Sequence, residues 1–286
     1  MCKTTDHDYA FYADTDSCYI TLDKVITKFF GNRSKERVIE VIDKMCEEQL
    51  VKVINKSCAE VAEYTNAFDA KKVYFKREAI ADHGIWVAKK RYALNVFDNE
   101  GVRYTEPKLK VMGLEIVRSS TPNVVRKALK ESVKIALTQT EDRLQAYVKE
   151  VEAMFMKCAV EDISFPRSVN GMTKYASKSE IYTKGTPMHV RGSLMFNHLV
   201  NKHNLSNKYQ PIREGDKIKF VYLKTPNTIQ ENCIAYTATL PKEFNLHTYI
   251  DYNMMFEKTF LDPLMVILTC IGWNHKPVAS LEGLFS

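Results

Sequence analysis

The stretch Tyr12-Ala13-Asp14-Thr15-Asp16-Ser17 decides how the fold and the chemistry of this sequence are interpreted. Residues 9–12 and 18–22 on either side are apolar and aromatic-rich, which is typical of two strands joined by a tight turn at Asp14-Thr15. Such a turn brings two carboxylates to an exposed tip, where their mutual repulsion favours binding of a cation. Hard oxygen ligands suit Mg²⁺, but Asp and Thr are also common in ordinary turns, so this stretch alone leaves both interpretations open.

The composition is that of a folded protein without membrane or disulfide features. The chain has 286 residues, 45% of them hydrophobic, which is enough for one large domain or two ordinary ones and argues against general disorder. No apolar run approaches the roughly 20 residues of a membrane span, and no signal-peptide pattern opens the sequence. The seven cysteines are scattered without a C-x-x-C pair, which predicts reduced thiols and argues against a zinc ribbon or a disulfide framework.

The net charge of +6 is concentrated in one region of the sequence. Residues 71–130 contain 14 Lys and Arg against 6 Asp and Glu, a local charge of +8, so the rest of the chain sums to −2. A charge excess confined to one region indicates a surface that binds a polyanion such as DNA. The alternative is a solvated basic face without a partner.

Periodicity in the first part predicts one long helix and several antiparallel strands. Ser34 is expected to cap a packing helix that runs to about residue 64. Residues 72–79 and 85–97 are expected to be strands, and a turn at 98–101 leads into a return strand from residue 102. The apolar positions of the helix are Val38, Val41, Ile42, Met45, Val53, Ile54, Cys58 and Val61.

From about residue 113 the sequence becomes mainly helical. Thr121-Pro122 is a strong helix start, since a hydroxyl residue precedes Pro at the first helical position, and Thr140 marks a second start. We therefore predict an α+β protein whose first part is an antiparallel sheet with a packing helix. The other expectations for the second part are helices over 189–203 and 248–271, short strands over 217–223 and 233–237, and a long polar loop over 164–184.

A second motif, Lys89-Lys90-Arg91-Tyr92, lies inside the strand predicted over 85–97. Three consecutive cations are costly to bury, so the motif indicates either contact with a polyanion or an edge strand guarded by charge. Strand alternation is expected to send Lys90 and Tyr92 to one face of the sheet, and Lys89 and Arg91 to the other.

The two motifs together resemble the family B DNA polymerases, and most closely those of large tailed bacteriophages. The Y-x-D-T-D-S hairpin matches motif C of the family's palm, and K-K-R-Y, roughly seventy residues later, matches its primer-binding element. The resemblance implies the C-terminal part of a palm in residues 1–113 and a thumb in residues 114–279. It continues in collinear order through Lys110-Val111-Met112-Gly113-Leu114-Glu115, Arg118-Ser119-Ser120-Thr121-Pro122, His189-Val190-Arg191-Gly192 and Ala279-Ser280-Leu281-Glu282-Gly283-Leu284-Phe285.

The resemblance also implies a role for the residues of both motifs. Asp16 matches the metal-binding aspartate of motif C, and Asp14 matches its neighbour, which helps to set the metal coordination. Lys90 matches the residue that orients the primer end, so Asp16, Asp14 and Lys90 are the expected catalytic residues. The expected DNA contacts are Lys89, Lys90, Arg91, Tyr92 and Arg118.

Three further positions qualify this match. Asp98 and Glu78 are nearby carboxylates that either support the metal site or act as structural salt-bridge partners. Many members of the family have Gly where this chain has Ala13. The extra methyl group beside the turn is expected to shift the hairpin slightly, so an identical primer-end geometry is not expected.

The last residues are unusually apolar for a chain terminus, with Leu281, Leu284 and Phe285 among the final six. Such a tail resembles the peptide by which phage polymerases insert into a hydrophobic pocket of the sliding clamp. The alternative is a terminal helix packed against the thumb. The expected clamp-binding residues are Ser280, Leu281, Glu282, Gly283, Leu284, Phe285 and Ser286.

Several parts of a polymerase are not found in this sequence. It contains no motif A aspartate, no fingers helix of the K-x-x-x-N-S-x-Y-G type and no exonuclease pattern. Two-metal phosphoryl transfer needs carboxylates from more than one place, so we expect two Mg²⁺ ions shared with an N-terminal polymerase polypeptide, and no synthesis by this chain alone. The other implied partners are primer–template DNA, a nucleoside triphosphate and a sliding clamp, in the cytoplasm of an infected bacterial host. The alternatives are a truncated form of a longer polymerase and a non-catalytic DNA- and clamp-binding module.

Overall fold

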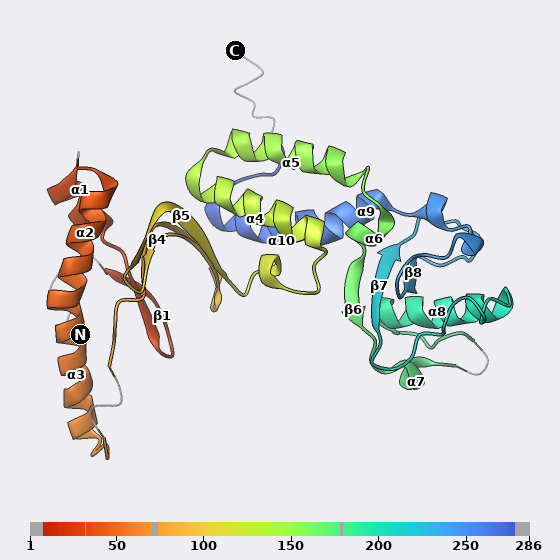
Figure 1. Cartoon of the computed structure of the whole chain (residues 1–286), viewed down its shortest axis with the longest axis horizontal. Helices are drawn as coiled ribbons and strands as arrows, with labels where there is room; N and C mark the ends of the chain where they lie inside the picture. Colours follow the sequence, from red (N-terminus) through yellow and green to blue (C-terminus); the bar gives the residue numbers. More distant parts are fainter. Residues whose placement is uncertain (1–7, 32, 70–73, 178–179, 278–286) are drawn as a thin grey trace, which may run out of the picture. The chain divides into compact units, whose positions relative to one another are not determined.

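The computed structural model describes residues 8–31, 33–69, 74–177 and 180–277. The chain divides into two compact units, Met1–Lys110 and Val111–Ser286, and the division lies close to residue 113, where the sequence predicts a boundary. Both units combine helices with antiparallel strands, so the α+β prediction is confirmed (Figure 1).

The strands described in the first unit form two sheets. β1 (Ala10–Asp14) and β2 (Ser17–Ile20) pair as an antiparallel hairpin, as the sequence predicts. β3 (Ala79–Ala88), β4 (Arg91–Asn99) and β5 (Val102–Met112) form a second sheet in that order, and β5 is the predicted return strand. The central strand β4 is buried along most of its length, so it forms the core of this unit.

One long helix accompanies these strands. α2 (Lys35–Met45), the π-helical turn η1 (Cys46–Leu50) and α3 (Val51–Tyr64) follow one another without a break (Figure 1). The Ser34 hydroxyl accepts a hydrogen bond from the Arg37 backbone N at 3.4 Å, so the predicted cap and the predicted extent of the helix are both confirmed. The shorter helix α1 (Asp23–Phe30), which precedes it, was not predicted.

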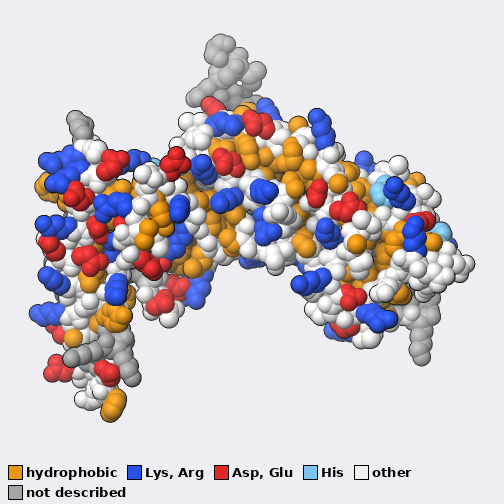
Figure 2. Space-filling view, viewed as in Figure 1, with side chains coloured by type: hydrophobic (Ala, Val, Ile, Leu, Met, Phe, Trp, Pro, Cys, Tyr) orange, Lys and Arg blue, Asp and Glu red, His pale blue; other side chains and the backbone are white. Residues whose placement is uncertain are grey.

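The apolar stripe of this long helix is only partly covered by the described residues. Ile39 in α2 is buried, whereas Val53 and Val61 in α3 are 58% and 61% exposed. Figure 2 shows hydrophobic side chains at the surface near the end of α3. The prediction of a packing helix therefore fits α2 better than the outward face of α3.

Two strand predictions in the first unit are wrong. Residues 74–78 lie in the strand predicted over 72–79 but have no regular structure, and residues 72–73 lie outside the described residues. The reason is that the backbone of Phe75 bonds to a side chain instead of a neighbouring strand, since the Asn55 amide both accepts from Phe75 N at 2.6 Å and donates to Phe75 O at 3.3 Å. The strand predicted over 85–97 is interrupted by a turn, which is described with the site below.

Helices make up most of the second unit. α4 (Asn123–Thr138) packs against α5 (Glu141–Phe155) and against α10 (Asp262–Ile271), as Figure 1 shows. The Thr140 hydroxyl caps α5 as predicted, whereas Pro122 occupies the N-cap of α4 without a side-chain cap. No helix among the described residues is long and apolar enough to cross a membrane. The shorter helical segments are η2 (Glu115–Val117), α6 (Val160–Ile163), η3 (Lys242–Phe244), η4 (His247–Tyr249), α9 (Tyr252–Phe256) and η5 (Glu257–Leu261).

A small antiparallel sheet lies in the same unit. Its strands β6 (Phe165–Ser168), β7 (Lys217–Tyr222) and β8 (Cys233–Tyr236) follow in that order, and β7 and β8 agree with the predictions. β6 and the short helix α7 (Met172–Tyr175) correct the loop predicted over 164–184. The strand forms there because the Phe165 ring stacks on the ring of Phe220 in β7, with their centroids 5.0 Å apart.

Gly192 permits a close approach between a helix and this sheet. It lies in α8 (Met188–Lys202), which was predicted over 189–203 and which packs against β8. A Cβ atom at residue 192 would lie 2.8 Å from the backbone N of Ala235 and 3.2 Å from its Cβ atom. The obstacle is mostly backbone, so it cannot move aside as a flexible side chain would. Packing thus explains why a residue of low helix propensity lies inside this helix.

We expect Gly192→Ala to lower the free energy of unfolding by about 1–3 kcal/mol, the usual cost of overpacking a well-packed core. This loss is expected even though Ala raises helix propensity by about 1 kcal/mol. Urea denaturation measures the difference. The control is Asn201→Ala, an exposed position on the same helix, which should change stability by less than about 0.5 kcal/mol. Equal stability of Gly192→Ala and the wild type would contradict the packing argument.

Candidate active site

The two aspartates of the first hairpin lie in different surroundings. Side chains along β1 and β2 alternate between a covered and an exposed face, as the pleat of a strand requires. Asp14 lies on the covered face with 12% of its side chain exposed, whereas Asp16 is exposed. The turn consists of Thr15 and Asp16, which corrects the predicted turn at Asp14-Thr15. The Thr15 hydroxyl donates a hydrogen bond to Asp14 Oδ1 at 3.2 Å.

Aromatic residues hold this hairpin against β3 and β4, among them Phe11, whose ring centroid lies 4.7 Å from that of Trp86. The Tyr19 hydroxyl donates a hydrogen bond to the Tyr92 hydroxyl at 2.7 Å. The ring centroid of Tyr19 lies 5.5 Å from that of Trp86 and 5.4 Å from that of Tyr12. Burial and the hydrogen bond with Tyr92 raise the pKa of Tyr19, so its hydroxyl keeps its proton at neutral pH. Sequence reasoning missed these supporting roles of Tyr12, Tyr19 and Trp86, although aromatic residues flanking the hexapeptide were a signal for them.

The second motif forms a turn between β3 and β4. β3 ends at Ala88 and β4 begins at Arg91, so Lys89 and Lys90 are the two turn residues, and the continuous strand predicted over 85–97 is wrong. Lys90 has φ of 60°, a left-handed conformation that is uncommon for a residue other than Gly. Its backbone N donates a hydrogen bond to the Tyr12 hydroxyl at 2.9 Å, which stabilises the turn from outside.

Both lysines of this turn approach one carboxylate. Lys89 Nζ lies 3.6 Å from Asp14 Oδ1, and Lys90 Nζ lies 3.6 Å from Asp14 Oδ2. The prediction that Lys89 and Lys90 face opposite ways is therefore wrong, because neither residue is in a strand. Both lysine side chains are more than half exposed, and such exposed ion pairs are weak and easily exchanged.

Mg²⁺ suits the oxygen atoms that this hairpin offers. One or two carboxylates with substrate phosphates form a common magnesium site, and Asp14 and Asp16 fit that description. Within the described residues, however, no three His, Cys, Asp or Glu side chains gather where a metal ion could be held. The two lysines at Asp14 supply the compensating positive charge in this arrangement. The hairpin thus fits one part of a magnesium site.

The two other candidate carboxylates are engaged with cations. The Asp98 side chain is 0% exposed, and its oxygens lie 2.6 Å from Arg77 Nη1 and 3.4 Å from Arg103 Nε. Both arginines also contact Asp43 of α2. Glu78 pairs with Lys110. The sequence left open whether these two carboxylates support the metal site or act as structural salt-bridge partners. Their contacts are those of salt-bridge partners.

Arg77 determines the protonation of Asp98. Burial alone would raise the pKa of Asp98, but the hydrogen bond and the charge of Arg77 outweigh burial, and the pKa lies below its ordinary value. The backbone N of Gly101 donates a further hydrogen bond to Asp98 at 3.0 Å. Asp98 therefore stays ionised and joins the helix α2 to the sheet through the two arginines.

We expect Asp98→Asn to lower the free energy of unfolding by about 3–5 kcal/mol at neutral pH, because it leaves the buried Arg77 without its closest anion. A depressed pKa means that this contribution is complete above the ordinary Asp pKa of about 3.9 and is lost as pH falls through the lower folded-state value. Urea denaturation between pH 7 and pH 3 should therefore show the gap between variant and wild type narrowing in acid. The control Glu78→Gln removes an exposed pair and should cost less than about 1 kcal/mol. A gap that widens in acid would contradict this role.

The remaining predicted site residues lie in three other places. Arg91 is the first residue of β4. Arg118 lies in the second unit, where its Nη1 is 3.5 Å from Glu115 Oε1 and its Nη2 donates to the Gly113 carbonyl at 3.3 Å. About half of the Arg118 side chain is exposed and so accessible to a ligand. The predicted clamp-binding residues 280–286 lie outside the described residues.

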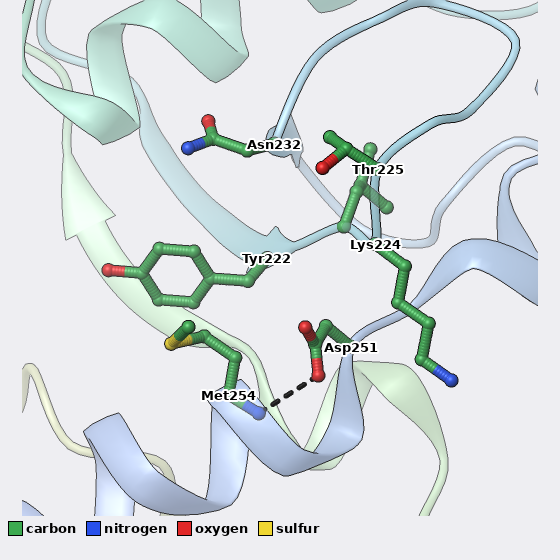
Figure 3. Close-up of a pocket in the computed structure, with 7 residues that line it drawn as sticks. Tyr222, Lys224, Thr225, Asn232, Asp251 and Met254 are labelled. Atoms are coloured by element: carbon green, nitrogen blue, oxygen red, sulfur yellow. Dashed lines mark hydrogen bonds between the residues drawn. The ribbon is translucent and has the colours of Figure 1, made fainter.

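An open depression in the second unit is a separate feature, shown in Figure 3. Its acidic residue, Asp251, is engaged as the N-cap of α9, since its Oδ1 accepts a hydrogen bond from Met254 N at 3.0 Å. Lys224 extends away from Tyr222 in this view. The depression therefore offers no pair of reactive groups comparable to those of the first hairpin. Its lining residues are Tyr222, Leu223, Lys224, Thr225, Asn232, Asp251 and Met254.

Comparison with known proteins gives consistent matches. Residues 2–236 match the family described as divergent family B DNA polymerase. Over its full length the chain is 33% identical to the DNA-directed DNA polymerase of Enterobacteria phage T4 and 35% identical to that of Escherichia phage RB69. A DNA polymerase of Methanocaldococcus jannaschii is 26% identical over 216 residues, which are 74% of this chain and 11% of that protein. The chain spans about a third of the length of the two phage relatives, 33% in each case.

Proposed function

Because this chain belongs to the family B DNA polymerases, we propose that it supplies the C-terminal part of the palm and the thumb of a replicative DNA-directed DNA polymerase. The substrates are then primer–template DNA and a nucleoside triphosphate. The observation that carries the proposal is the pair of docked hairpins. One hairpin presents Asp14 and Asp16, and the turn of the other brings Lys89 and Lys90 to Asp14.

In this proposal the first hairpin holds magnesium. Asp16, exposed at the turn, binds the ion directly, and Asp14 sets the coordination from the covered face of the hairpin. When bound, the two ions stabilise the charge that develops on the transferring phosphoryl group. The aromatic residues beneath the hairpin keep both carboxylates in place while DNA and nucleotide bind and leave.

Lys89 and Lys90 exchange partners during this cycle. Without DNA their ammonium groups neutralise Asp14, and with DNA they contact the phosphates of the primer–template duplex. Weak pairing at 3.6 Å and long exposed side chains make the exchange inexpensive in free energy. The hydrogen bond from Lys90 N to the Tyr12 hydroxyl holds the backbone, so only the side chain has to move.

The missing carboxylates come from an N-terminal polymerase polypeptide. The described residues offer no group of three ligating side chains, whereas two-metal transfer needs several carboxylates. The same partner supplies the fingers and the exonuclease, and assembly takes place in the cytoplasm of an infected bacterium. The incomplete metal site also favours a second candidate function, a non-catalytic DNA- and clamp-binding module, and a primer-extension assay separates the two.

We expect this chain, mixed with the N-terminal polymerase polypeptide of the same source, to extend a labelled primer in the presence of Mg²⁺. Asp16→Asn should reduce the extension rate by several orders of magnitude, because it removes a charged metal ligand. The chain alone should extend nothing. The control Asp142→Asn changes an exposed carboxylate in the first turn of α5 and should extend normally. A mixture that fails to extend, or that extends equally well with Asp16→Asn, would show that the catalytic proposal is wrong.

The C-terminal tail is proposed to bind a sliding clamp. The support is its sequence, since Leu281, Leu284 and Phe285 supply three large apolar side chains within a short segment. Deletion of residues 280–286 should spare distributive extension by the mixture and abolish its stimulation by the clamp. The measurement is product length on a long primed template with and without clamp. Equal product lengths with and without the tail would instead support the alternative of a helix packed on the thumb.

A further inference from the structure

A guanidinium group in the second unit is half-buried without an acidic partner. Arg167 lies in β6, and its Nη1 donates to the carbonyl of Ser120 at 3.1 Å and to that of Pro166 at 3.4 Å. Its Cζ atom lies over the Phe165 ring at 5.7 Å from the centroid. Arg167 takes part in none of the ion pairs among the described residues, although a partly buried charge is costly to leave without an opposite charge.

The groups around Arg167 are themselves basic. Burial lowers the pKa of Arg167, and the positive charge of Arg118 lowers it further, while Tyr222 acts in the opposite direction. Burial and the charge of Arg167 lower the pKa of His189. The Ser120 carbonyl that accepts from Arg167 belongs to the same short segment as Arg118. The hydrogen bond to the Ser120 carbonyl therefore brings the Arg167 side chain to the segment that carries Arg118, and the charge of Arg167 also acts on His189.

The sheet register places Arg167 on the face of the small sheet against which α8 packs. Arg167 pairs with Ile218 and Phe165 pairs with Phe220, so the Arg167 side chain shares a face of the sheet with these residues of β7. On β8, Cys233 Sγ donates to the carbonyl of Met188, the first residue of α8. α8 has no side-chain cap, and His189 lies in its first turn.

We propose that Arg167, together with Arg118 and His189, binds a backbone phosphate of the DNA duplex, an inference that rests on the proposed function. Arginine binds phosphate through two parallel hydrogen bonds, and partial burial strengthens such a charged contact. Within the described residues only Nη1 of Arg167 donates to the protein, which leaves Nε and Nη2 for the ligand.

DNA is favoured over free phosphate by the position of Arg118. That residue belongs to the basic region 71–130 and is the expected primer–phosphate contact of this unit. A phosphate bound by both arginines would therefore belong to the DNA strand that Arg118 contacts. The other arginine of this neighbourhood, Arg191, is already engaged, because it lies 3.8 Å from Glu231 Oε2 and donates to Asn232. Arg167 is the group left in need of an anion.

The test measures binding of a fluorescent primer–template duplex by the full chain as a function of salt. Arg167→Ala should bind more weakly and should reduce the slope of log affinity against log salt concentration by about 0.9, the loss of one phosphate contact. Arg167→Lys should keep most of the slope, because it keeps the charge. The control Arg143→Ala removes an arginine that is paired with Glu150 on α5, and it should match the wild type.

A second measurement uses His189 as a reporter in the unaltered chain. A phosphate at Arg167 neutralises the charge that depresses the pKa of His189, so NMR titration should show that pKa rising when the duplex is added. Inorganic phosphate at the same phosphate concentration provides the comparison. This readout does not depend on whether Arg167→Ala folds, and circular dichroism checks the variants.

The outcomes separate this inference from the proposed function. If the wild-type chain does not bind the duplex, this inference is wrong, whereas the proposed function is decided by primer extension with the N-terminal polypeptide. If it binds but Arg167→Ala keeps the affinity and the salt slope of the wild type, the inference alone is wrong. If inorganic phosphate raises the pKa of His189 and the duplex does not, the site binds free phosphate and the assignment to DNA is overturned.

Discussion

The hydrogen bond from the Lys90 backbone N to the Tyr12 hydroxyl joins two hairpins that are far apart in the sequence. A single bond of this kind contributes only about 1 kcal/mol, but it fixes where the Lys89-Lys90 turn lies. The aromatic cluster formed by Tyr12, Tyr19, Trp86 and Tyr92 supplies the apolar contact around it. With the turn fixed, both ammonium groups reach Asp14. The candidate site thus depends on the contact between the two hairpins, which brings the carboxylates of one to the lysines of the other.

The same interaction explains why sequence reasoning located the first hairpin and failed at the second. The hexapeptide carries a local signal, because strand-forming residues flank polar turn residues, and the hairpin follows almost as expected. The turn at Lys89-Lys90 has no Gly or Asn to announce its left-handed residue, and apolar residues continue on both sides. Its stabilising partner, Tyr12, is distant in sequence, so a local pattern could not reveal it. The Ser34 cap was predictable for the opposite reason, since its partner is Arg37.

The candidate carboxylates also differ in whether their surroundings are set by neighbouring residues or by residues distant in the sequence. The sequence identified Asp14, Asp16, Glu78 and Asp98 as acidic residues of interest, but it could not rank them by environment. Asp98 is fully buried between Arg77 and Arg103, and both arginines also hold Asp43 of a helix that lies far away in the sequence. Only the fold brings these four together. Asp16, by contrast, is exposed because it is a turn residue, although the sequence predicts the turn one position earlier, at Asp14-Thr15.

Pairing in the fold also changes the meaning of the basic region 71–130. Its charge of +8 suggests a broad surface for DNA. However, Arg77, Arg103 and Lys110 form ion pairs with carboxylates of the same unit. The cations left for a ligand there are fewer and more specific, such as the exchangeable pair at Asp14. Arg167 lies outside that region and does not contribute to its net charge. It is half-buried, and no acidic side chain contacts it among the described residues. The phosphate site that we propose at Arg167 therefore rests on a half-buried cation without an acidic contact among the described residues, and not on the local density of charge.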